Sequence, residues 1–466
     1  MKPSESNNGK SMPANRIATQ ARVCAHQAVE CITTVLFARH PADRTLRDIF
    51  LHNRQFGSRD RRIISETVYS VLRWWGWLSK LAPEYFTKAL EAGEKAPAAH
   101  GSDWYPVLAA SWLLENRFEL PSSVMFWLRE AKLYPEAFAD IPEDTPFNER
   151  RKYLRPFFLK RAMPSMTLEE LMPLWFQEEL CEELAADYRK FLDWQQRRPP
   201  AWIRAQTKDL GKLVHDVEAQ AEGKVRMLPH EQVKGAYAVR NAAANFRGLP
   251  AFQEGRFEMQ DIAAQCAGLV CAPKPGQQWW DACAGGGGKS LHLAWLMQNS
   301  GTVLATDLRE EALEELKKRA HRGKFGNIRT RVWKGNPIPE NMKGKYDGVL
   351  VDVPCTCSGT WRRAPEGRWN TTRDMVAKSA ETQLRLLENA SAAVRPGGTL
   401  VYSTCSVLRA ENLGVIEKFL AAHPDFVLDP HPNPMDGVIT PGMTQIKPWD
   451  ADSDAMFTAK MHRRKG

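Results

Sequence analysis

The C-terminal half of the chain alternates short apolar runs with amphipathic segments, and this alternation constrains the fold more than any other feature. The apolar runs, each of strand length, are 278–282, 302–306, 328–333, 346–351 and 398–403. The segments between them that have a helical pattern are 262–270, 310–321 and 373–394. Strands that alternate with helices build parallel sheets, because each helix returns the chain to the same end of the sheet. The sequence therefore predicts an α/β domain with a mainly parallel sheet from Gly255 onward.

Two of these runs end in residues that can carry out chemistry. The run 346–351 is followed by Asp352, a proline and Cys355, and the run 398–403 is followed by Thr404 and Cys405. In an open α/β sheet, ligands bind just beyond the carboxyl ends of the strands. We therefore expect one carboxylate and two thiols to meet at the same edge of the sheet.

A glycine-rich loop follows the first of these runs and opens a helix. Its residues are Cys283, Ala284, Gly285, Gly286, Gly287, Gly288 and Lys289. A phosphate-binding P-loop requires a glycine where Cys283 stands, and the neighbouring Asp281 disfavours a triphosphate. The alternative is a nucleoside cofactor without phosphates, because glycines let the backbone approach such a ligand closely.

Asp307 supports the second interpretation. It ends the run 302–306, where a carboxylate can accept hydrogen bonds from both hydroxyls of a ribose. S-adenosylmethionine has a ribose, lacks phosphates and carries a sulfonium charge that tolerates nearby carboxylates. We therefore predict that residues 283–289 and Asp307 bind S-adenosylmethionine.

The two thiols suit a methyl transfer to cytosine. Carbon 5 of cytosine is a poor nucleophile, but a thiolate that adds to carbon 6 converts the ring to an enamine that can attack a methyl sulfonium. The carbon 5 proton must then be removed and the thiol expelled. A carboxyl group at ring nitrogen 3 stabilises the charge that develops during addition. Asp352, Cys355 and Cys405 supply these groups.

The other cysteines carry no comparable signal. The chain has nine cysteines without metal-ligand spacing, and the pair formed by Cys355 and Cys357 has no second pair to accompany it. We expect no metal site, and we expect reduced thiols in a cytoplasmic protein. Free cysteines are commonly buried as small apolar residues, which is our interpretation of Cys24, Cys31, Cys181, Cys266 and Cys271.

Length, charge and hydropathy set the remaining limits. No apolar run is long enough to span a bilayer, and residues 1–15 lack the apolar core of a signal peptide, so we expect a disordered tail there. Lys and Arg number 64 against 55 Asp and Glu, and the formal net charge of +9 suits a polyanionic partner. At 466 residues, the chain should form two or three domains.

Two regions precede the α/β domain. Residues 16–165 carry helical patterns and many tryptophans, and Ser58 is a suitable N-cap for one of the helices. The apolar residues that share one face of this helix are Ile63, Val68, Val71, Leu72 and Trp75. Its basic residues, which either contact phosphates or form a solvated face, are Arg59, Arg61, Arg62 and Arg73. Residues 170–254 alternate short strand-like runs with one helix, which predicts a small α+β module.

Together these motifs resemble the Nol/Nop/Sun family of RNA 5-methylcytosine methyltransferases, which have a Rossmann-like core. The motifs that carry the resemblance are Gln260-Asp261, Asp281 to Lys289, Asp307, Asp352-Val353-Pro354-Cys355, 362–369 and Thr404-Cys405-Ser406. The resemblance implies that Cys405 is the nucleophile, that Cys355 assists elimination and product release, and that Asp352 contacts the cytosine. It also implies that residues 283–289, Asp307 and Asp352 bind S-adenosylmethionine in a methyltransferase domain over 255–466. Residues 16–165 resemble a NusB-like RNA-binding domain.

Three positions depart from the family pattern. The family loop usually reads Ala-Pro-Gly-Gly-Lys, and the absence of its proline predicts a more flexible loop and a lower cofactor affinity. Asn336 stands where the family often has an aspartate that binds adenine, and its carbonyl can still accept a hydrogen bond from the adenine amino group. Cys357 stands where glycine or alanine is usual, and register with Pro354 favours Cys355 as the functional thiol.

We therefore expect methyl transfer from S-adenosylmethionine to carbon 5 of a cytosine in RNA, with ribosomal RNA favoured because the NusB-like region resembles that branch. The cytosine should be unpaired or flipped out of its helix, and the protein should act as a monomer away from membranes. Phosphate contacts are expected from Arg362, Arg363 and Arg368, and Trp361 or Trp369 either stacks on a base or packs the loop. The alternatives are a transfer RNA or DNA cytosine methyltransferase and a noncatalytic RNA-binding assembly factor.

Overall fold

The chain forms two compact units in the computed structural model, which describes residues 13–98, 100–115, 120–133, 142, 145–158, 166–240 and 245–465. One unit is Met1–Leu174 with Ala364–Asn370, and the other is Trp175–Arg363 with Thr371–Gly466. Of the predicted tail, residues 1–12 lie outside the described residues, and Ala14 begins the first helix. No helix in the described part of the chain has both the length and the apolarity needed to cross a membrane.

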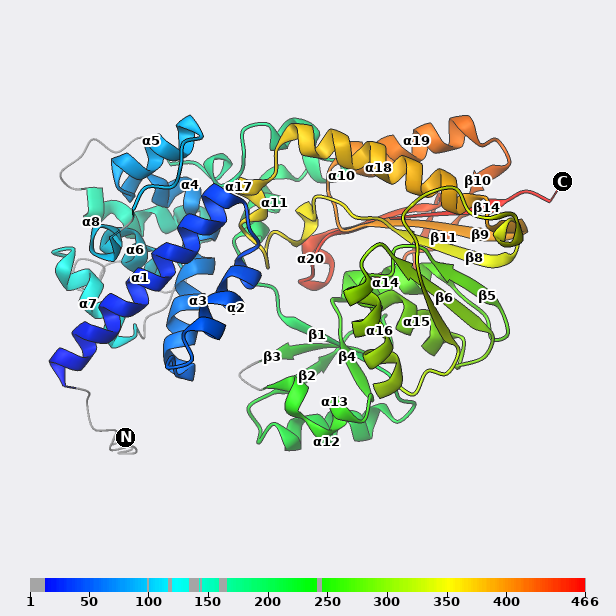
Figure 1. Cartoon of the computed structure of the whole chain (residues 1–466), viewed down its shortest axis with the longest axis horizontal. Helices are drawn as coiled ribbons and strands as arrows, with labels where there is room; N and C mark the ends of the chain where they lie inside the picture. Colours follow the sequence, from blue (N-terminus) through cyan, green and yellow to red (C-terminus); the bar gives the residue numbers. More distant parts are fainter. Residues whose placement is uncertain are drawn as a thin grey trace. The chain divides into compact units, whose positions relative to one another are not determined.

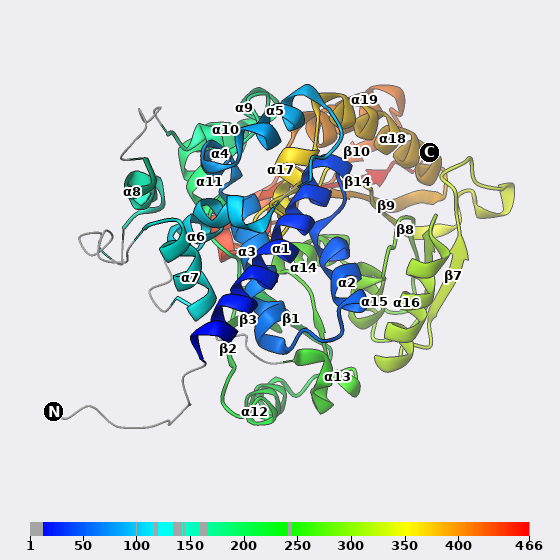
Figure 2. The ribbon, with the colours of Figure 1, turned by 60° about the vertical axis from the view of Figure 1, so that its left-hand side comes forward.

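The first unit is helical, as predicted for this region. Its helices are α1 (Ala14–Ala38), α2 (Ala42–His52), α3 (Ser58–Arg73), α4 (Trp75–Leu78), α5 (Glu84–Ala92), α6 (Tyr105–Leu114), α7 (Ser122–Glu130), α8 (Arg155–Phe158) and α17 (Gly367–Asn370). Figure 2 shows α1, α3, α6 and α7 packed side by side, and one apolar core lies among them. The predicted buried face of α3 is confirmed, because its core residues include Ile63, Val68, Val71 and Leu72. The N-cap is Gly57 instead of Ser58, and its backbone N–H donates to the side chain of Asp60.

A short segment from the second half of the chain completes the helical unit. Within residues 364–370, Arg368 is fully buried, and its guanidinium donates to the carbonyl oxygen of Arg73 over 3.1 Å. The indole N–H of Trp369 donates to the carbonyl oxygen of Leu72 over 2.7 Å. The expected phosphate contact of Arg368 is therefore wrong, because this buried guanidinium donates to the carbonyl oxygens of Arg73 and Leu171. Trp369 packs against the helical core.

The second unit begins with a small α+β module. Its elements are α9 (Phe176–Glu179), α10 (Glu182–Ala185), α11 (Tyr188–Gln195), β1 (Ala201–Ala205), α12 (Leu210–Gln220), β2 (Arg226–Pro229), β3 (Ala236–Arg240), α13 (Pro250–Gln253) and β4 (Phe257–Met259). The strands form an antiparallel sheet in the order β2-β3-β1-β4. The sheet extends past the expected boundary at residue 254, because β4 pairs with β1.

An eight-stranded sheet forms the centre of the second unit, in the order β10-β14-β9-β8-β5-β6-β7 with β13 beside β14. Its strands are β5 (Gln278–Asp281), β6 (Thr302–Asp307), β7 (Ile328–Val332), β8 (Tyr346–Asp352), β9 (Val394–Thr404), β10 (Phe426–Leu428), β13 (Met443–Ile446) and β14 (Met456–Arg463). The five strands from β9 to β7 run parallel, whereas β14 is antiparallel to β9. A separate two-stranded sheet joins β11 (His431–Pro432) and β12 (Ile439–Thr440). The predicted mainly parallel α/β sheet is confirmed.

Helices cover both faces of this sheet, because its central strands are apolar on both sides. Val349 and Val351 pack in the core that α18 (Arg373–Ser391) and α19 (Leu413–Ala422) cover. Leu350, between them, packs on the other face. The helices on that face are α14 (Ile262–Cys271), α15 (Gly288–Leu296) and α16 (Glu310–Arg322). Figure 1 shows α18 and α19 on the side of the strands opposite α14 and α15.

One predicted boundary differs from the structure. The sequence pattern predicts a helix over 373–394, but α18 ends at Ser391 and β9 already begins at Val394. Proline disfavours the helical conformation of the residue before it, and Gly397 has a φ of 74°. The segment therefore forms the irregular start of a strand, with a register shift in its pairing to β8.

Candidate active site

A cavity of about 730 Å³ opens where the central strands of the second unit end. Four residues that end or directly follow β5, β6, β8 and β9 line it: Ala282, Asp307, Asp352 and Cys405. Parallel strands end at one edge of the sheet, so residues far apart in the sequence meet there. The cavity is therefore the place where the predicted site residues can act together.

The two predicted thiols meet in this cavity. Cys355 follows β8, Cys405 follows β9, and their Sγ atoms lie 3.4 Å apart. The two strands pair in parallel with Asp352 opposite Ser403, so both chain segments leave the sheet at the same level. Both cysteines are half-buried and are free thiols. The structure thus brings Asp352, Cys355 and Cys405 to one edge.

Lys289 of the glycine-rich loop holds Asp352. The Nζ atom of Lys289 donates to Oδ2 of Asp352 over 2.7 Å. Burial raises the pKa of Asp352, although the ammonium group of Lys289 acts in the opposite direction. Burial lowers the pKa of Lys289 and the Asp352 carboxylate raises it, and the net direction is upward. The pair therefore offers a carboxyl group with a raised pKa beside a fixed positive charge, which suits contact with a ring nitrogen.

The structure also brings the glycine-rich loop to Asp307. The backbone N–H of Gly285 donates to Oδ2 of Asp307 over 2.8 Å. The backbone N–H and the Nε of Arg309 donate to Oδ1 over 2.9 and 3.1 Å. Burial acts to raise the pKa of Asp307, but these hydrogen bonds prevail and lower it. The pKa of Asp307 therefore stays low, and the carboxylate is ionised beside the glycine-rich loop.

Arg319 of α16 braces the loop from outside the cavity. Its Nη1 donates to the carbonyl oxygen of Gly286 over 2.6 Å, and its Nη2 donates to Oε2 of the buried Glu258 over 3.0 Å. Gly287 has a φ of 83°, and a Cβ atom there would lie 2.4 Å from Cγ of Leu316. The loop is therefore held by a guanidinium group and by close packing, although it lacks the proline of the family pattern.

Three predicted cofactor residues are not among those that line the cavity: Gly287, Gly288 and Asn336. The two glycines turn the chain into α15. Asn336 is exposed, and its backbone carbonyl oxygen accepts a hydrogen bond from Nε1 of Trp333 over 2.9 Å. Trp333 and Gly335 line the cavity in its place.

Sequence reasoning missed Glu411, which ties the two thiol-bearing loops together. Its Oε1 accepts from the backbone N–H of Thr356 over 2.9 Å and from Nε2 of Gln383 over 3.0 Å. Its Oε2 accepts from the hydroxyls of Thr356 and Ser406. Thr356 adjoins the first thiol and Ser406 the second, so one buried carboxylate fixes both loops. The only signal for Glu411 in the sequence is that an acidic residue follows the Thr404-Cys405-Ser406 motif closely.

Cys357 adds a third sulfur to the cavity. It is exposed, has a φ of 55°, and its Sγ lies within 4.8 Å of those of Cys355 and Cys405. Hydrogen bonds from the other two thiols hold the pKa of Cys357 well below its usual range. Hydrogen bonds with Cys357 and Cys405 raise the pKa of Cys355. The thiol of Cys355 acts to lower the pKa of Cys405, but Cys357 and burial prevail and raise it to about 12. The three thiols therefore influence one another's ionisation.

The remaining two arginines expected to contact phosphates are engaged by the protein itself. Arg362 is fully buried, and its Nη2 donates to Asp452 over 2.6 Å. The Nε of Arg363 donates to both carboxylate oxygens of Asp454. The expected phosphate contacts are wrong, because these guanidinium groups anchor the loop to the C-terminal segment. Trp361 is buried and packs the loop, which was one of its two predicted roles.

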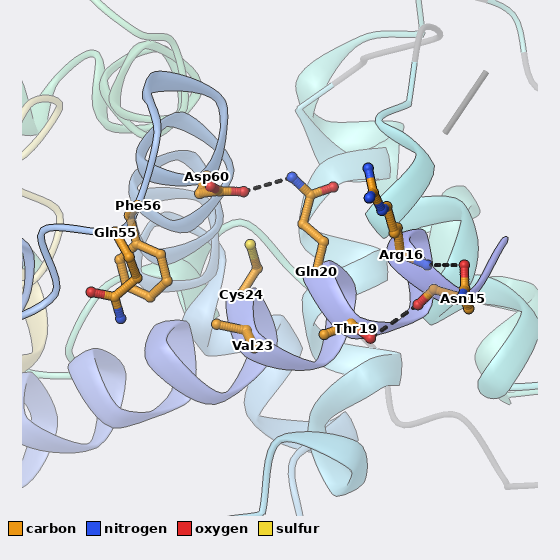
Figure 3. A pocket seen from close by; sticks show the side chains of 9 residues that line it. All are labelled: Asn15, Arg16, Thr19, Gln20, Val23, Cys24, Gln55, Phe56 and Asp60. Atoms are coloured by element: carbon orange, nitrogen blue, oxygen red, sulfur yellow. Dashed lines mark hydrogen bonds between the residues drawn. The ribbon is translucent and has the colours of Figure 1, made fainter. Parts of the chain in front are cut away.

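The helical unit has hollows of its own. One, of about 410 Å³, is lined by α1 and the start of α3, and Gln20 donates to Asp60 there over 2.6 Å (Figure 3). Cys24 also lies there, and burial raises its pKa to about 12. A second hollow, of about 720 Å³, is lined by aromatic and basic side chains that include Arg47, Phe50, Arg54, Arg61 and Tyr69.

Comparisons with known proteins identify the family of the chain. The family described as 16S rRNA methyltransferase RsmB/F matches residues 268–462. Ribosomal RNA small subunit methyltransferase B of Salmonella paratyphi C is 30% identical over 302 residues, which are 63% of this chain and 67% of that protein. The probable ribosomal RNA small subunit methyltransferase B of Bacillus subtilis is 34% identical over 235 residues, which are 49% and 52% of the two chains.

A solved structure extends the likeness to the whole chain. The crystal structure of PH0851 has a TM-score of 0.72 and 26% identity, and the match covers 97% of this chain and 99% of that one. The sequence matches to the curated relatives span between 49% and 67% of those proteins' length. The resemblance drawn from the motifs is confirmed, and the chain belongs to the RsmB/F family of methyltransferases.

Proposed function

We propose that this protein transfers a methyl group from S-adenosylmethionine to carbon 5 of a cytosine in ribosomal RNA, through a covalent bond between Cys405 and carbon 6. The observation that carries the proposal is the 3.4 Å separation of the Cys355 and Cys405 sulfur atoms, beside Asp352 in one cavity. Two thiols beside one carboxyl group suit a reaction in which one thiol adds to the base and the other serves the elimination.

The cofactor would lie between Asp307 and the glycine-rich loop. The Asp307 carboxylate keeps acceptor capacity for ribose hydroxyls, because two oxygens offer about four lone pairs. Gly285 has a φ of 53°, and a Cβ atom there would lie 3.7 Å from Nη2 of Arg309. That separation is an ordinary contact, so it is the left-handed backbone that favours glycine here. When bound, S-adenosylmethionine supplies the methyl group as a sulfonium electrophile.

The chain's own residues would divide the covalent steps. The thiolate of Cys405 forms a bond to carbon 6, and the carboxyl group of Asp352, fixed by Lys289, stabilises the charge that moves onto ring nitrogen 3. The electron pair of the enamine would then form the bond from carbon 5 to the methyl group, and the demethylated thioether of the donor would leave. A base then takes the carbon 5 proton, and the electron pair of that bond returns to the ring, which breaks the bond from carbon 6 to sulfur and releases Cys405 as thiolate. Cys355, whose sulfur touches that of Cys405, assists this elimination.

Ribosomal RNA is the substrate that the family relationship favours, because the curated relatives described above carry that function in their names. The helical unit would act as a NusB-like RNA-binding domain. Its hollow with Arg47, Arg54 and Arg61 beside Phe50 and Tyr69 offers charges for phosphates and rings for unpaired bases. The target cytosine must leave its stack to reach two thiols at the edge of a sheet.

Two other functions remain as outcomes of the test. A transfer RNA or DNA cytosine methyltransferase would share the chemistry but not the substrate, and a DNA enzyme would use the Pro-Cys thiol, Cys355, as nucleophile. A noncatalytic assembly factor would bind RNA without S-adenosylmethionine. Calorimetric titration with S-adenosylmethionine separates this last function, because an assembly factor would show no binding at millimolar cofactor.

The direct test compares bisulfite sequences of total RNA from cells with the protein, without it, and with Cys405→Ala in its place. We expect a cytosine in small-subunit ribosomal RNA that is protected from conversion only by the wild-type protein. Protection restricted to a transfer RNA would move the substrate to that class. Protection that persists with Cys405→Ala would show that Cys405 is not the nucleophile.

A further inference from the structure

Three cysteine sulfurs converge at the edge of the main sheet. The Sγ atoms of Cys355, Cys357 and Cys405 all lie within 4.8 Å of one another. Within the described residues, no other group of three or more His, Cys, Asp or Glu side chains has its potential metal-binding atoms this close together. Two of the sulfurs serve the methyl transfer proposed above, and that reaction leaves the third without a role.

The backbone at Cys357 gives a second indication that this sulfur is more than a bystander. Its φ of 55° lies in the left-handed region, which strains the backbone of a residue other than glycine. Non-glycine residues held in such conformations cluster at functional sites. A cysteine thus occupies a position that suits glycine, and this conformation brings its sulfur to the other two.

We propose that Cys355, Cys357 and Cys405 form a three-thiolate site for a thiophilic divalent cation of the Zn²⁺ and Cd²⁺ class. In a tetrahedral zinc site with Zn–S bonds of about 2.3 Å, the sulfur atoms lie about 3.8 Å apart. The 3.4 Å between the sulfurs of Cys355 and Cys405 and the 4.8 Å limit for the group bracket this spacing. Small side-chain rotations would therefore bring all three sulfurs to bonding distance.

The surroundings of the cluster suit such an ion. Cys357 is exposed, so an ion can enter from solvent and a water molecule can take the fourth position. The charged groups nearest the cluster are the ion pair of Lys289 with Asp352 and the buried carboxylate of Glu411. Each thiol that binds the ion gives its proton to solvent, so binding should tighten as pH rises.

Occupancy would have a consequence for catalysis. A metal-bound Cys405 has its lone pair committed to the ion and cannot add to carbon 6. The ion would therefore inhibit methyl transfer reversibly, and a chelator would restore it. Metal binding itself needs neither RNA nor S-adenosylmethionine, so it can be measured whether or not the proposed methyl transfer takes place.

The test titrates Cd²⁺ into the full-length reduced protein and follows the thiolate-to-metal charge-transfer absorption in the ultraviolet. The key variant is Cys357→Gly, because glycine suits the left-handed backbone and should fold without strain. The matched control is Cys283→Ser, which removes a thiol of the same cavity that lies outside the cluster.

We expect one Cd²⁺ per chain for the wild type and for Cys283→Ser. For Cys357→Gly we expect an affinity lower by about 100-fold or more, because loss of even an outer-shell partner costs 10- to 100-fold in metal affinity. Equal affinity of Cys357→Gly and the wild type would overturn the proposal.

Thiol alkylation of the wild-type protein gives an independent check. After reaction with iodoacetamide, mass spectrometry should find Cys355, Cys357 and Cys405 protected together by Cd²⁺, with Cys283 unprotected. Failure of Cd²⁺ to protect Cys357 and Cys405 would reject the three-thiolate site even if each variant failed to fold. Methyl transfer that is absent while this protection is present would count against the proposed function alone.

Discussion

The Sγ atoms of Cys355 and Cys405 lie 3.4 Å apart, although the two residues are separated by 50 positions in the chain. The contact follows from the parallel pairing of β8 with β9, which sets Asp352 opposite Ser403 and sends both chain segments out of the sheet together. Both sulfurs and the Asp352 carboxyl group therefore line one cavity.

The two thiols should fail in different ways when they are replaced. Cys405→Ala should reduce methyl transfer to background, a fall of roughly 10⁴-fold or more, because no covalent intermediate can form. Cys355→Ala should instead accumulate a protein–RNA adduct that survives denaturing electrophoresis, because addition continues while elimination is slowed. A stable adduct with Cys405→Ala and none with Cys355→Ala would reverse the two roles.

Glu411→Gln should loosen both thiol-bearing loops. The amide oxygen of glutamine cannot replace both carboxylate oxygens that accept from Thr356 and Ser406. We expect kcat to fall by about 100-fold, the cost of a displacement of about 1 Å at reacting groups, with little change in the Kd of S-adenosylmethionine.

Glu417→Gln is the matched control for this prediction, because Glu417 pairs with Arg409 at the surface. Its kcat should stay within about twofold of the wild type, since exposed ion pairs contribute little. Equal kcat values for Glu411→Gln and the wild type would show that Glu411 does not position the thiols.

Gly287→Ala should destabilise the protein and weaken cofactor binding. The new Cβ would lie 2.4 Å from Leu316, in addition to the strain of a φ of 83°. Overpacking costs about 1–3 kcal/mol and the backbone strain about 1–2 kcal/mol, so the free energy of unfolding in urea should fall by about 2–5 kcal/mol.

Gly276→Ala separates these two causes. Gly276 has a φ of 86°, and a Cβ atom there would have no other atom within 4 Å. Gly276→Ala should therefore lower the free energy of unfolding only by the backbone strain, about 1–2 kcal/mol. Equal losses for both variants would mean that the loop does not depend on its close packing against α16.

Asp281 should make stability depend on pH. Burial raises its pKa to about 7, although the hydroxyl of Ser290 donates to it and acts in the opposite direction. The folded state therefore binds a proton that the unfolded state releases near pH 4. The contribution of this proton to the free energy of unfolding is fully present below about pH 4 and is lost as pH rises through about 7.

Asp281→Asn removes this titration and keeps an oxygen that can accept from Ser290. The difference in unfolding free energy between variant and wild type should therefore grow in favour of the variant between about pH 4 and 7, by at most about 1.4 kcal/mol per pH unit. Urea unfolding at several pH values measures it. A difference that does not change with pH would mean that Asp281 titrates alike in both states.

The sequence pattern was sufficient for the core of the fold and for the meeting of the thiols. Apolar runs that alternate with helical segments predict parallel strands, and parallel strands must release Asp352, Cys355 and Cys405 at one edge. These predictions needed only local periodicity and the general rule for open sheets. The same reasoning placed Val68 and Val71 correctly on the buried face of α3.

The positions that were mispredicted depend on tertiary contacts that local pattern does not encode. Arg368 looks like a phosphate ligand in the sequence, but its guanidinium reaches carbonyl groups almost 300 residues away along the chain. Arg363 is similarly engaged by Asp454. Glu411 was overlooked because its role comes from joining two loops. The contact of Asn336 with adenine comes from the family pattern and stays a prediction, because local pattern does not fix the path of the loop after β7.

The most direct measurement uses RNA in which 5-fluorocytosine replaces cytosine. A base can remove hydrogen from carbon 5 as a proton but cannot remove fluorine as a cation, so the adduct is trapped after methyl transfer. The full-length protein is incubated with this RNA and S-adenosylmethionine, and the crosslinked peptide is sequenced by mass spectrometry. We expect the modified nucleotide on Cys405, with the methyl group already on the base. A nucleotide attached to Cys355, or methylated RNA without any protein adduct, would contradict a mechanism in which Cys405 is the nucleophile.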